Sequence, residues 1–579
     1  MSPMLLTDNL NLLWSSLIVA ELVKNGLDTF FVSPGNRNAP LIAALAYEER
    51  AVKKICVDER AAGYRALGHA KATGRAGVLL CTSGTASANY YPAVIEAARE
   101  EIPLVILSAD RPPELVGSDA NQTIVQPDLF GRYGRESLFL PRPSTDYPLE
   151  ALLAKIDSLV ARPIGPVHIN CPFGDPLIPG VPDRCPMPGD LPAAARRLYE
   201  RKGPYTVHPA PVVLPPGLED IAATLRNTGR GLAVVGRLDS PQDVPALEEL
   251  LQRLDWPVFC DIASSLKGRV RTDAQIFSLD HPEAIRLVKA YAPETILQFG
   301  TGLVSKHYYA SILPKSDATL IQVSPRGGLR DPAHRASIRI QAPVHAFIGG
   351  LNFSGPLSFD GAARLKFLNQ MEALHHAVAE RITPGALSYP RIASIFLGGI
   401  PEGEGLFLGN STVIRAFDAT RCPRPRQMRV ISNRGASGIE GNIATSVGFA
   451  EAAGVRVTAV IGDISFLHDL NSLLLLRQSE TPVILVVINN GGGRIFERLP
   501  IGDFPEMVDP YLITPHAMDF HHLAEQFSLP YFHAGTADEL AVAYGEALGA
   551  KRSAFVEVTL SPAEDLRIYR AMQQVRLDE

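Results

Sequence analysis

Short apolar runs alternate with helical stretches along the first part of the chain. Five of these runs end in polar or Gly/Pro turns: DTFFVSPG, KKICVDER, AGVLLCTSG, IPLVILSADRPP and GPVHINCP. The stretches between them, such as AAGYRALGHAKATG, are rich in Ala and Leu, which favour helix. The alternation predicts parallel strands joined by helices, in a sheet that helices cover on both faces.

The same alternation recurs in two later parts of the chain. A second unit has the predicted strands GRGLAVVGRL, WPVFCDI, PETILQFGTG and ATLIQVSP, and a third has GLFLGNS, MRVISNRGASG, VRVTAVIGDIS, PVILVVINNGGG and AFVEVTL. A proline-dense stretch before the second unit indicates a linker. We therefore predict an α/β fold of three doubly wound parallel-sheet domains, divided as residues 1–185 (N-terminal domain), 186–217 (linker), 218–355 (Rossmann-like middle domain), 356–384 (connecting segment, with a helix near 362–382) and 385–579 (C-terminal domain).

Composition narrows the class of protein. A chain of 579 residues is too long for one ordinary core, and 46% hydrophobic with 20% charged residues is typical of folded domains. The net charge of -6, without a run of Lys or Arg, argues against a nucleic-acid partner and against a membrane surface. The six cysteines form no C-x-x-C pair, which argues against a zinc knuckle or a disulfide framework.

The N-terminal segment indicates in which compartment of the cell the protein is expected. Residues 1–26 carry Asp8 and Glu21 and lack the basic start of a signal peptide, so we interpret them as an amphipathic helix. No apolar run reaches the ~20 residues that a membrane span needs. We therefore expect a cytoplasmic protein.

Two polar turns follow neighbouring strands of the third unit. Gly462-Asp463 ends the strand VRVTAVI, and Asn489-Asn490 ends PVILVVI. The helical stretch HDLNSLLLLRQ lies between them, with Asp469 as a possible N-cap. Ligands of open parallel sheets bind outside the carboxyl ends of the strands, so Asp463 and Asn490 should lie side by side.

These two turns have the chemistry of a cation site. A carboxylate, an amide oxygen and a backbone carbonyl from the turn Gly491-Gly492-Gly493 suit a Mg²⁺ ion that keeps water and phosphate oxygens as its other ligands. Alone, each turn is ordinarily structural. Together, at this spacing, they resemble the fingerprint of thiamine-diphosphate enzymes, except that Ile464 stands where many such enzymes have Gly.

Glu59 follows the strand KKICV in the turn Asp58-Glu59-Arg60. A lone turn of this kind is ordinarily solvated. Thiamine enzymes resemble one another in having a buried Glu, from the N-terminal domain, that hydrogen-bonds the aminopyrimidine ring of the cofactor. On that resemblance Glu59 takes this role, and burial should raise the pKa of its carboxyl group.

Several cations lie at predicted strand ends. Arg37, Arg111, Arg415 and Arg434 occur in turns rich in Gly, Pro or Asn, and Lys306 follows the strand LQFGTG. Any one of them could form a surface salt bridge. Because Arg suits bidentate recognition of carboxylates, the group as a whole indicates substrates with several carboxylates.

Ten segments together resemble one family of thiamine-diphosphate enzymes, the 2-succinyl-5-enolpyruvyl-6-hydroxy-3-cyclohexene-1-carboxylate (SEPHCHC) synthases of menaquinone or phylloquinone biosynthesis. They are SPGNRNAPL, DERAAGYRALGHAKATG, TSGTASANYYPAVIEA, ADRPPEL, ANQTIVQ, GPVHINCPF, GNSTVIR, SNRGASGIEG, GDISFLHDLN and NNGGGRIFERLP. The resemblance covers the first and third units and is thin over residues 190–400.

The resemblance implies a reaction and its partners. The enzyme would use thiamine diphosphate with Mg²⁺ or Mn²⁺, decarboxylate 2-oxoglutarate and add the resulting succinyl carbanion to isochorismate. It would be a homodimer or homotetramer with active sites between subunits. Two alternatives stay open: another thiamine-dependent decarboxylase or carboligase with a different acceptor, and a non-catalytic thiamine-binding protein. The presence of Glu59 argues against the second.

The resemblance also implies roles for individual residues. The catalytic residues would be Glu59, Arg37 and Gln122, and the metal ligands Asp463, Asn490 and Gly492. The cofactor would be bound by Pro34, Glu59, Ser83, Asn89, Ile439, Asp463, Ile464, Ser465, Asn490, Gly492, Gly493 and Ile495, with Ile439 supporting its bent form. The substrates would be bound by Arg37, Arg111, Asn121, Gln122, Lys306, Ser411, Arg415, Arg434, Phe496 and Leu499.

Two features depart from simple expectation. Asn36 and Asn38 stand where family members often have Ser, so a role that needs a hydroxyl at the first of these positions is in doubt here. The middle unit lacks a G-x-G-x-x-G sequence after a strand, which argues against a nucleotide site there.

Overall fold

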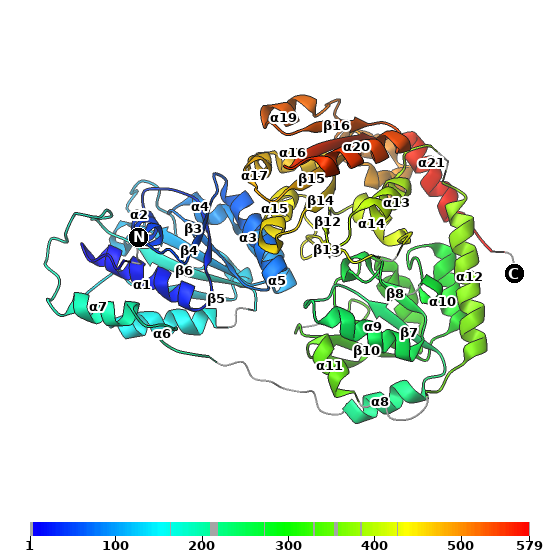
Figure 1. The fold of residues 1–579 in the computed structure, drawn as a ribbon, viewed down its shortest axis with the longest axis horizontal. Helices are drawn as coiled ribbons and strands as arrows, with labels where there is room; N and C mark the ends of the chain where they lie inside the picture. The colour runs from blue at the N-terminus through cyan, green and yellow to red at the C-terminus, as the bar shows by residue number, and fades with distance from the viewer. Residues whose placement is uncertain are drawn as a thin grey trace. The chain divides into compact units, whose positions relative to one another are not determined.

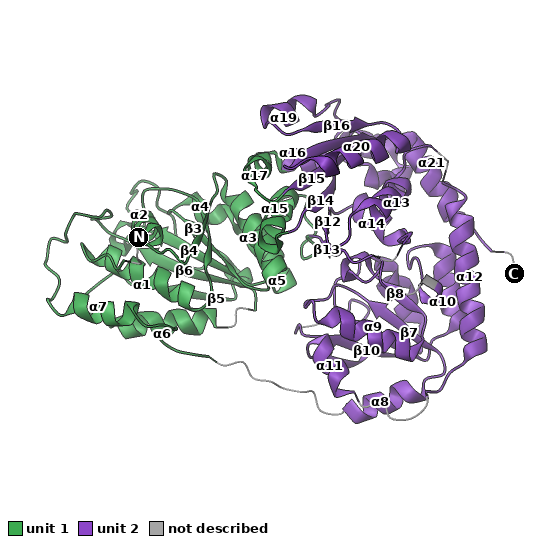
Figure 2. Cartoon of the chain, in the orientation of Figure 1, with its two compact units in different colours: residues 1–211, 433–454, 469–481 green, residues 212–432, 455–468, 482–579 purple. Residues whose placement is uncertain are grey.

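The chain forms two compact units, each drawn in its own colour in Figure 2. The computed structural model describes residues 4–577 apart from 162–163, 209–217, 271, 328–329, 352–356, 383–384 and 425. Unit 1 consists of residues 1–211, 433–454 and 469–481, and unit 2 of residues 212–432, 455–468 and 482–579. The described residues contain three parallel sheets with helices around them (Figure 1), which confirms the predicted α/β fold.

Unit 1 contains one six-stranded parallel sheet. Its strands, in spatial order, are β2 (Val52–Ile55), β1 (Thr29–Val32), β3 (Gly77–Cys81), β4 (Leu104–Asp110), β6 (Pro166–Pro172) and β5 (Glu136–Phe139). Its helices are α1 (Leu10–Lys24), α2 (Ala39–Ala46), α3 (Glu59–Thr73), α4 (Thr85–Asn89), α5 (Tyr91–Glu100), α6 (Leu149–Val160), α7 (Leu191–Tyr199), α15 (Asn442–Ala453) and α17 (Leu473–Gln478).

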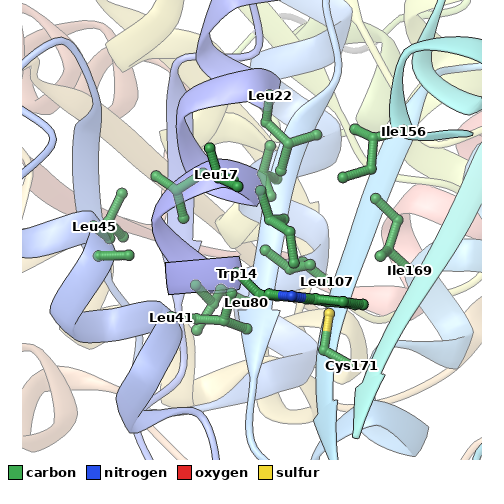
Figure 3. Packing of buried hydrophobic residues seen from close by; sticks show 14 of the residues in the cluster. Trp14, Leu17, Leu22, Leu41, Leu45, Leu80, Leu107, Ile156, Ile169 and Cys171 are labelled. Atoms are coloured by element: carbon green, nitrogen blue, oxygen red, sulfur yellow. The ribbon is translucent and has the colours of Figure 1, made fainter. Parts of the chain in front are cut away.

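Helix α1 lies in the core of unit 1. Every residue from Asn11 to Val23 is buried, because α2, α6 and α7 all contact the helix. In Figure 3, Trp14 and Leu17 of α1 pack with Leu41 of α2 and Leu107 of β4. The prediction of an amphipathic helix is therefore wrong: this helix is enclosed on all sides, as expected of a helix that is apolar around most of its circumference.

Helix α7 lies inside the segment predicted as a linker. Its residues Ala195 and Leu198 are buried in the core of unit 1, so residues 191–199 are not an irregular connection. Residues 209–217 of that segment lie outside the described residues. The domain boundaries themselves stay a prediction.

Helices α3 and α15 pack closely within unit 1. A Cβ atom added to Gly68 of α3 would lie 2.1 Å from the carbonyl oxygen of Thr445 in α15. The guanidinium of Arg65 also forms a buried ion pair with Glu451 of α15, at 2.7 Å. The absence of a side chain at Gly68 lets the backbones of α3 and α15 pack in direct contact, and the ion pair fixes the register of the two helices.

The start of α15 is capped from a distant position. The carboxylate of Asp469 accepts hydrogen bonds from the N–H of Ile443 (2.9 Å) and from the hydroxyl of Ser472 (2.8 Å). The helix predicted over 468–478 is interrupted: α16 (Asp463–His468) ends before Asp469, and α17 begins at Leu473. Asp469 therefore caps α15, not the helix for which it was predicted as N-cap.

Unit 2 contains two sheets, both parallel. The first has the order β11 (Ala336–Gln341), β10 (Thr319–Ser324), β9 (Thr295–Phe299), β7 (Gly231–Val235), β8 (Val258–Cys260), and the second β13 (Arg429–Ile431), β12 (Gly405–Leu408), β14 (Val457–Gly462), β15 (Val483–Asn489), β17 (Ala554–Thr559), β16 (Tyr531–Ala534). Its helices are α8 (Leu218–Asn227), α9 (Asp243–Leu254), α10 (Pro282–Tyr291), α11 (Val344–Gly350), α12 (Gly361–Ala379), α13 (Tyr389–Gly399), α14 (Thr412–Ala419), α16, α18 (Pro505–Tyr511), α19 (His521–Gln526), α20 (Ala537–Gly549) and α21 (Pro562–Gln573).

All six cysteines are free, and only Cys185 is exposed. Among the described residues, no helix combines the length and the apolarity that crossing a bilayer requires.

Candidate active site

Asp463 lies at the carboxyl edge of the second sheet of unit 2. Strands β14 and β15 are neighbours, so their ends bring Asp463 next to Asn490 and Gly492. Asp463 is 2% exposed, and its Oδ2 accepts the N–H groups of Asn490 (3.0 Å) and Gly492 (2.9 Å). Burial is the main cause that raises the pKa of this carboxyl group, and the backbone N–H of Gly492 opposes it.

The side-chain amide of Asn490 faces two oxygen atoms. One terminal atom of this amide lies 2.8 Å from the carbonyl oxygen of Gly492 and 3.2 Å from Oδ2 of Asp463. A nitrogen in that place donates to both oxygens. The opposite orientation of the same amide presents its oxygen beside the carboxylate and the carbonyl group, a set of ligands that suits a hard cation. The three residues therefore fit a hard divalent ion.

The turn after Asn490 requires glycine. Gly492 has φ +134°, and a Cβ atom there would lie 2.4 Å from the carbonyl oxygen of Ile513. Glycine at this position therefore lets the turn pack closely against the backbone of Ile513. The other predicted residues of this region lie on the same two connections: Ile464 and Ser465 in α16, Gly493 in the turn, Ile495 and Phe496 in the 3₁₀ turn Arg494–Arg498, and Leu499 directly after it.

Two residues near this cluster were not predicted. Nε2 of His516 lies 3.3 Å from Oδ2 of Asp463, and the hydroxyl oxygen of Tyr389 lies 3.2 Å from the Asn490 amide. Both side chains are almost fully buried. His516 belongs to an irregular loop and Tyr389 to the start of α13, so no periodicity or strand end in the sequence points to either residue.

Ser411 lies at the same edge of this sheet, whereas Arg415 lies within α14 and not in the turn predicted for it. Strand β12 pairs with β14, and Ser411 follows β12 with a φ of +67°. The guanidinium of Arg415 is exposed and donates to the Ser411 carbonyl oxygen at 2.5 Å. Lys306, which is also exposed, follows β9 in the other sheet of unit 2.

Glu59 is the first residue of α3, in unit 1. Asp58 caps this helix by accepting the N–H groups of Arg60 (2.8 Å) and Ala61 (3.2 Å), which fixes where the helix begins. Glu59 is half-buried, and burial is the main cause that raises the pKa of its carboxyl group. The charge of Asp58 raises this pKa further, and a hydrogen bond from Asn89 opposes it.

Unit 1 gathers further predicted residues at the carboxyl edge of its sheet. Arg37, after β1, is 7% exposed and donates from Nη1 to the carbonyl oxygen of Phe173 at 2.9 Å. Ser83, after β3, and Gln122 bond reciprocally: Ser83 Oγ donates to the Gln122 carbonyl, and Gln122 Nε2 donates to the Ser83 carbonyl, both at 3.1 Å. Arg111 follows β4.

Four asparagines and a proline complete the set in unit 1. Pro34, Asn36, Asn89 and Asn121 are exposed. Asn38 is fully buried: it accepts the N–H of Gly35 (3.1 Å) and donates to the Ser33 carbonyl (3.1 Å). Asn38 therefore closes the turn that carries Arg37, a task that does not need a hydroxyl group.

Arg434 and Ile439 lie on a loop that two buried carboxylates hold. Glu100 accepts the N–H of Arg434 at 3.0 Å. Glu96 accepts the N–H groups of Gly435 (2.7 Å) and Ala436 (2.6 Å). The side chain of Ile439 is 38% exposed. The predicted residues thus form two groups, one in each unit.

Three family models match successive parts of the chain. Residues 14–129 match the N-terminal TPP binding domain of thiamine pyrophosphate enzymes, where TPP is another abbreviation for thiamine diphosphate. Residues 202–355 match the middle domain of thiamine pyrophosphate enzymes, and residues 409–558 match the C-terminal TPP binding domain.

Curated relatives match the chain over nearly its whole length. A 2-succinyl-5-enolpyruvyl-6-hydroxy-3-cyclohexene-1-carboxylate synthase of Syntrophus aciditrophicus is 71% identical over 99% of this chain and 100% of the relative. Synthases of the same name are 37% identical in Pelodictyon phaeoclathratiforme, over 97% of this chain and 95% of the relative, and in Rubrobacter xylanophilus, over 98% of both.

Proposed function

We infer the reaction of this chain from its family, because the chain belongs to the SEPHCHC synthases, which are thiamine-diphosphate enzymes. It decarboxylates 2-oxoglutarate and joins the remaining succinyl unit to isochorismate, with release of CO₂. The observation that carries this conclusion is the 71% identity to a SEPHCHC synthase over the full chain. No feature favours a different acceptor.

A four-component assay tests the reaction. The purified protein would be given 2-oxoglutarate, isochorismate, thiamine diphosphate and Mg²⁺, and the loss of isochorismate absorbance would be followed. Consumption that requires all four components is the expected result. Release of CO₂ from 2-oxoglutarate without consumption of isochorismate would instead establish a thiamine enzyme with another acceptor.

We propose that Asp463, Asn490 and the carbonyl oxygen of Gly492 bind Mg²⁺ or Mn²⁺. The position of the Asn490 side-chain amide, 3.2 Å from the Asp463 carboxylate and 2.8 Å from the Gly492 carbonyl oxygen, supports the assignment. The ion would hold the diphosphate. When bound, thiamine diphosphate supplies the carbon nucleophile and the electron sink that decarboxylation of a 2-oxo acid requires.

Glu59 would hold a proton next to the aminopyrimidine ring. The burial that raises the pKa of its carboxyl group supports this role, because it favours the protonated form, which can share its proton with a ring nitrogen. Removal of the carboxylic acid should affect turnover more than cofactor binding, since the metal site belongs to other residues.

Arg37, Arg111, Arg415 and Arg434, with Lys306, would bind the carboxylates of the two substrates. Three of them follow strands whose carboxyl ends form an edge of a sheet: β1 for Arg37, β4 for Arg111 and β12 for Arg415. Such edges are the usual ligand-binding positions of open parallel sheets. Phe496 and Leu499 would form an apolar wall beside them.

We also propose that the active enzyme is a homodimer or homotetramer whose sites combine two subunits. A mixing experiment tests this: Glu59→Gln and Asp463→Ala variants, each inactive alone, would be unfolded together, refolded and assayed. If sites combine Glu59 of one subunit with Asp463 of another, the mixture regains part of the activity. No recovery in a mixture that light scattering shows to contain mixed oligomers would contradict the proposal.

A further inference from the structure

The segment between β4 and β5 carries three predicted substrate-binding residues but almost no regular structure. Arg111, Asn121 and Gln122 lie in it, and its only helical elements are the 3₁₀ turns Pro113–Leu115 and Gly131–Tyr133. Gln122 has a φ of +58°, an unusual value for a residue with a side chain. A segment with this backbone needs side-chain contacts to hold its shape.

Gln126 is the residue that supplies these contacts. Its side chain is fully buried, whereas the neighbouring Val125 is 69% exposed. Oε1 of Gln126 accepts the N–H of Gly84 at 2.8 Å, and Nε2 donates to Oδ1 of Asn170 (2.8 Å) and to the carbonyl oxygen of Ala109 (3.2 Å). One amide thus joins the segment to the carboxyl ends of β3, β4 and β6.

The partner on β6 is itself held in one orientation. Oδ1 of Asn170 also accepts the hydroxyl of Ser108 (2.8 Å), and Nδ2 donates to Oδ2 of Asp110 (2.8 Å). Oδ1 of Asp110 accepts the N–H of Arg111 at 2.7 Å. Asn170 therefore cannot rotate without losing bonds on both sides, and the same network that receives Gln126 also fixes the backbone of Arg111.

The buried side chain of His168 contacts this network at Ser108. Nε2 of His168 lies 2.7 Å from Oγ of Ser108. Burial lowers the pKa of His168 to about 4, so the imidazole is neutral at physiological pH.

Gln126 and Gln122 hold the same turn. Gln122 exchanges two hydrogen bonds with Ser83, and Gln126 accepts from the adjacent Gly84. The stretch from Gln122 to Gln126 is therefore fixed at both ends to residues 83–84. Asn121 is one residue beyond this fixed stretch.

We propose that Gln126 is a positioning residue for substrate binding: it docks the segment 119–126 on the strand ends and so sets Asn121 and Gln122 relative to Arg111. The inference rests on the proposed function for the identity of the substrates. It assigns to Gln126 no contact with them. Gln126 belongs to the segment ANQTIVQ and its partner Asn170 to GPVHINCPF, two of the ten segments that carry the family resemblance.

The test compares two variants that each lose the hydrogen bonds of a buried side-chain amide, four for Gln126 and three for Asn9. Gln126→Met keeps the shape of the side chain. Asn9→Leu is the matched control in unit 1, because Asn9 is fully buried, donates to Ile178 and Val181 and accepts from Leu12, none of which is a predicted site residue. Both should lower the thermal midpoint of unfolding.

Only Gln126→Met should change substrate binding. We expect about a tenfold or larger rise in KM for at least one substrate, a smaller change in kcat, and unchanged thermal stabilisation by thiamine diphosphate with Mg²⁺. Hydrogen exchange of backbone amides in residues 116–125 should become faster in Gln126→Met and not in Asn9→Leu. Equal KM values and equal exchange in the two variants would overturn the proposal.

Two safeguards keep the test decisive. If Gln126→Met does not fold, Gln126→Asn keeps an amide that is too short for all of its partners, and the same comparison applies to it. If the wild-type protein does not consume isochorismate, the proposed function fails, but the exchange of residues 116–125 still decides whether Gln126 docks the segment.

Discussion

Gly448 of α15 lies directly against the backbone of Arg65 in α3, so that a Cβ atom at Gly448 would come within 1.9 Å of the Arg65 carbonyl oxygen. Neither helix can yield at this point. Arg65 is held by Glu451, and Gly68 meets Thr445 one turn further along α3. The contact between α3 and α15 therefore tolerates no side chain at Gly448.

Gly448→Ala should destabilise unit 1 by about 3 kcal/mol, because the methyl group forces the helices apart. Gly545→Ala, in α20, is the control: no atom lies within 4 Å of its added Cβ, so the change should stabilise by up to about 1 kcal/mol. The chain has two tryptophans, Trp14 in unit 1 and Trp256 in unit 2. In a Trp256→Phe background, urea unfolding followed by Trp14 fluorescence measures unit 1 alone; for the control in unit 2, Trp256 fluorescence is followed in a Trp14→Phe background. A stable Gly448→Ala protein would contradict the close packing.

Glu59→Gln should lower kcat/KM by about 10²–10³-fold, since the amide cannot hold an exchangeable acidic proton. Thermal stabilisation by thiamine diphosphate with Mg²⁺ should remain. Glu136→Gln, an exposed position on β5, is the control and should leave both measurements unchanged. Wild-type turnover in Glu59→Gln would rule out the role assigned to this residue.

Asp463→Ala should abolish the rise in unfolding temperature that thiamine diphosphate with Mg²⁺ produces. In the wild type this stabilisation amounts to about 2.7 kcal/mol when the cofactor is present at a hundredfold excess over Kd. The loss is expected because the variant lacks a metal ligand. Differential scanning fluorimetry measures it, with the exposed Asp509→Ala as control. An equal rise in both variants would mean that the metal binds elsewhere.

Asp469→Asn should make unit 1 more stable at neutral pH. Burial raises the pKa of Asp469 to about 6, above its ordinary value of 3.8, so the ionised form is disfavoured in the folded protein. Asp469 therefore makes its full contribution to the free energy of unfolding below pH 4, where it is protonated in both states. This contribution is lost as the pH rises through 6, and the loss amounts to about 3 kcal/mol at most. An asparagine can still accept from Ile443 and can donate to Ser472.

The difference in the free energy of unfolding between Asp469→Asn and the wild type should therefore be small near pH 4 and largest above pH 7. Urea unfolding of the Trp256→Phe proteins at pH 4.5 and pH 7.5 measures it through Trp14. A difference of the same size at both pH values would show that Asp469 is not protonated in the folded state at low pH.

The interior strands were predictable from sequence, and three edge strands were not. β7, β9 and β15 are continuous apolar runs because helices cover both faces of their sheets. β5, β11 and β16 lie at sheet edges, where many of their residues are exposed, and their sequences ESLF, ASIRIQ and YFHA give no apolar run. These three edge strands form because each pairs with a neighbouring strand, and their local sequences do not reveal that pairing.

Some residues of the candidate site were likewise predictable from the sequence, and others were not. Asp463 and Asn490 could be predicted to meet because the topology of parallel strands places their turns at one edge. His516 and Gln126 could not, because each lies on an irregular segment whose path depends on the tertiary fold. Asp469 shows a third case: its capping chemistry was predicted, but the helix that it caps is a different one.

Unit 1 is assembled from three stretches of chain, and its central helix pair joins the first to the second. During synthesis, α3 leaves the ribosome long before α15 and α17 exist. The Gly68 face of α3 therefore stays exposed to solvent until α15 has been synthesised. Unit 1 can be completed only after most of unit 2 has been translated. A chain that terminates early would keep this face unprotected, so quality control of nascent protein should recognise premature products of this gene readily.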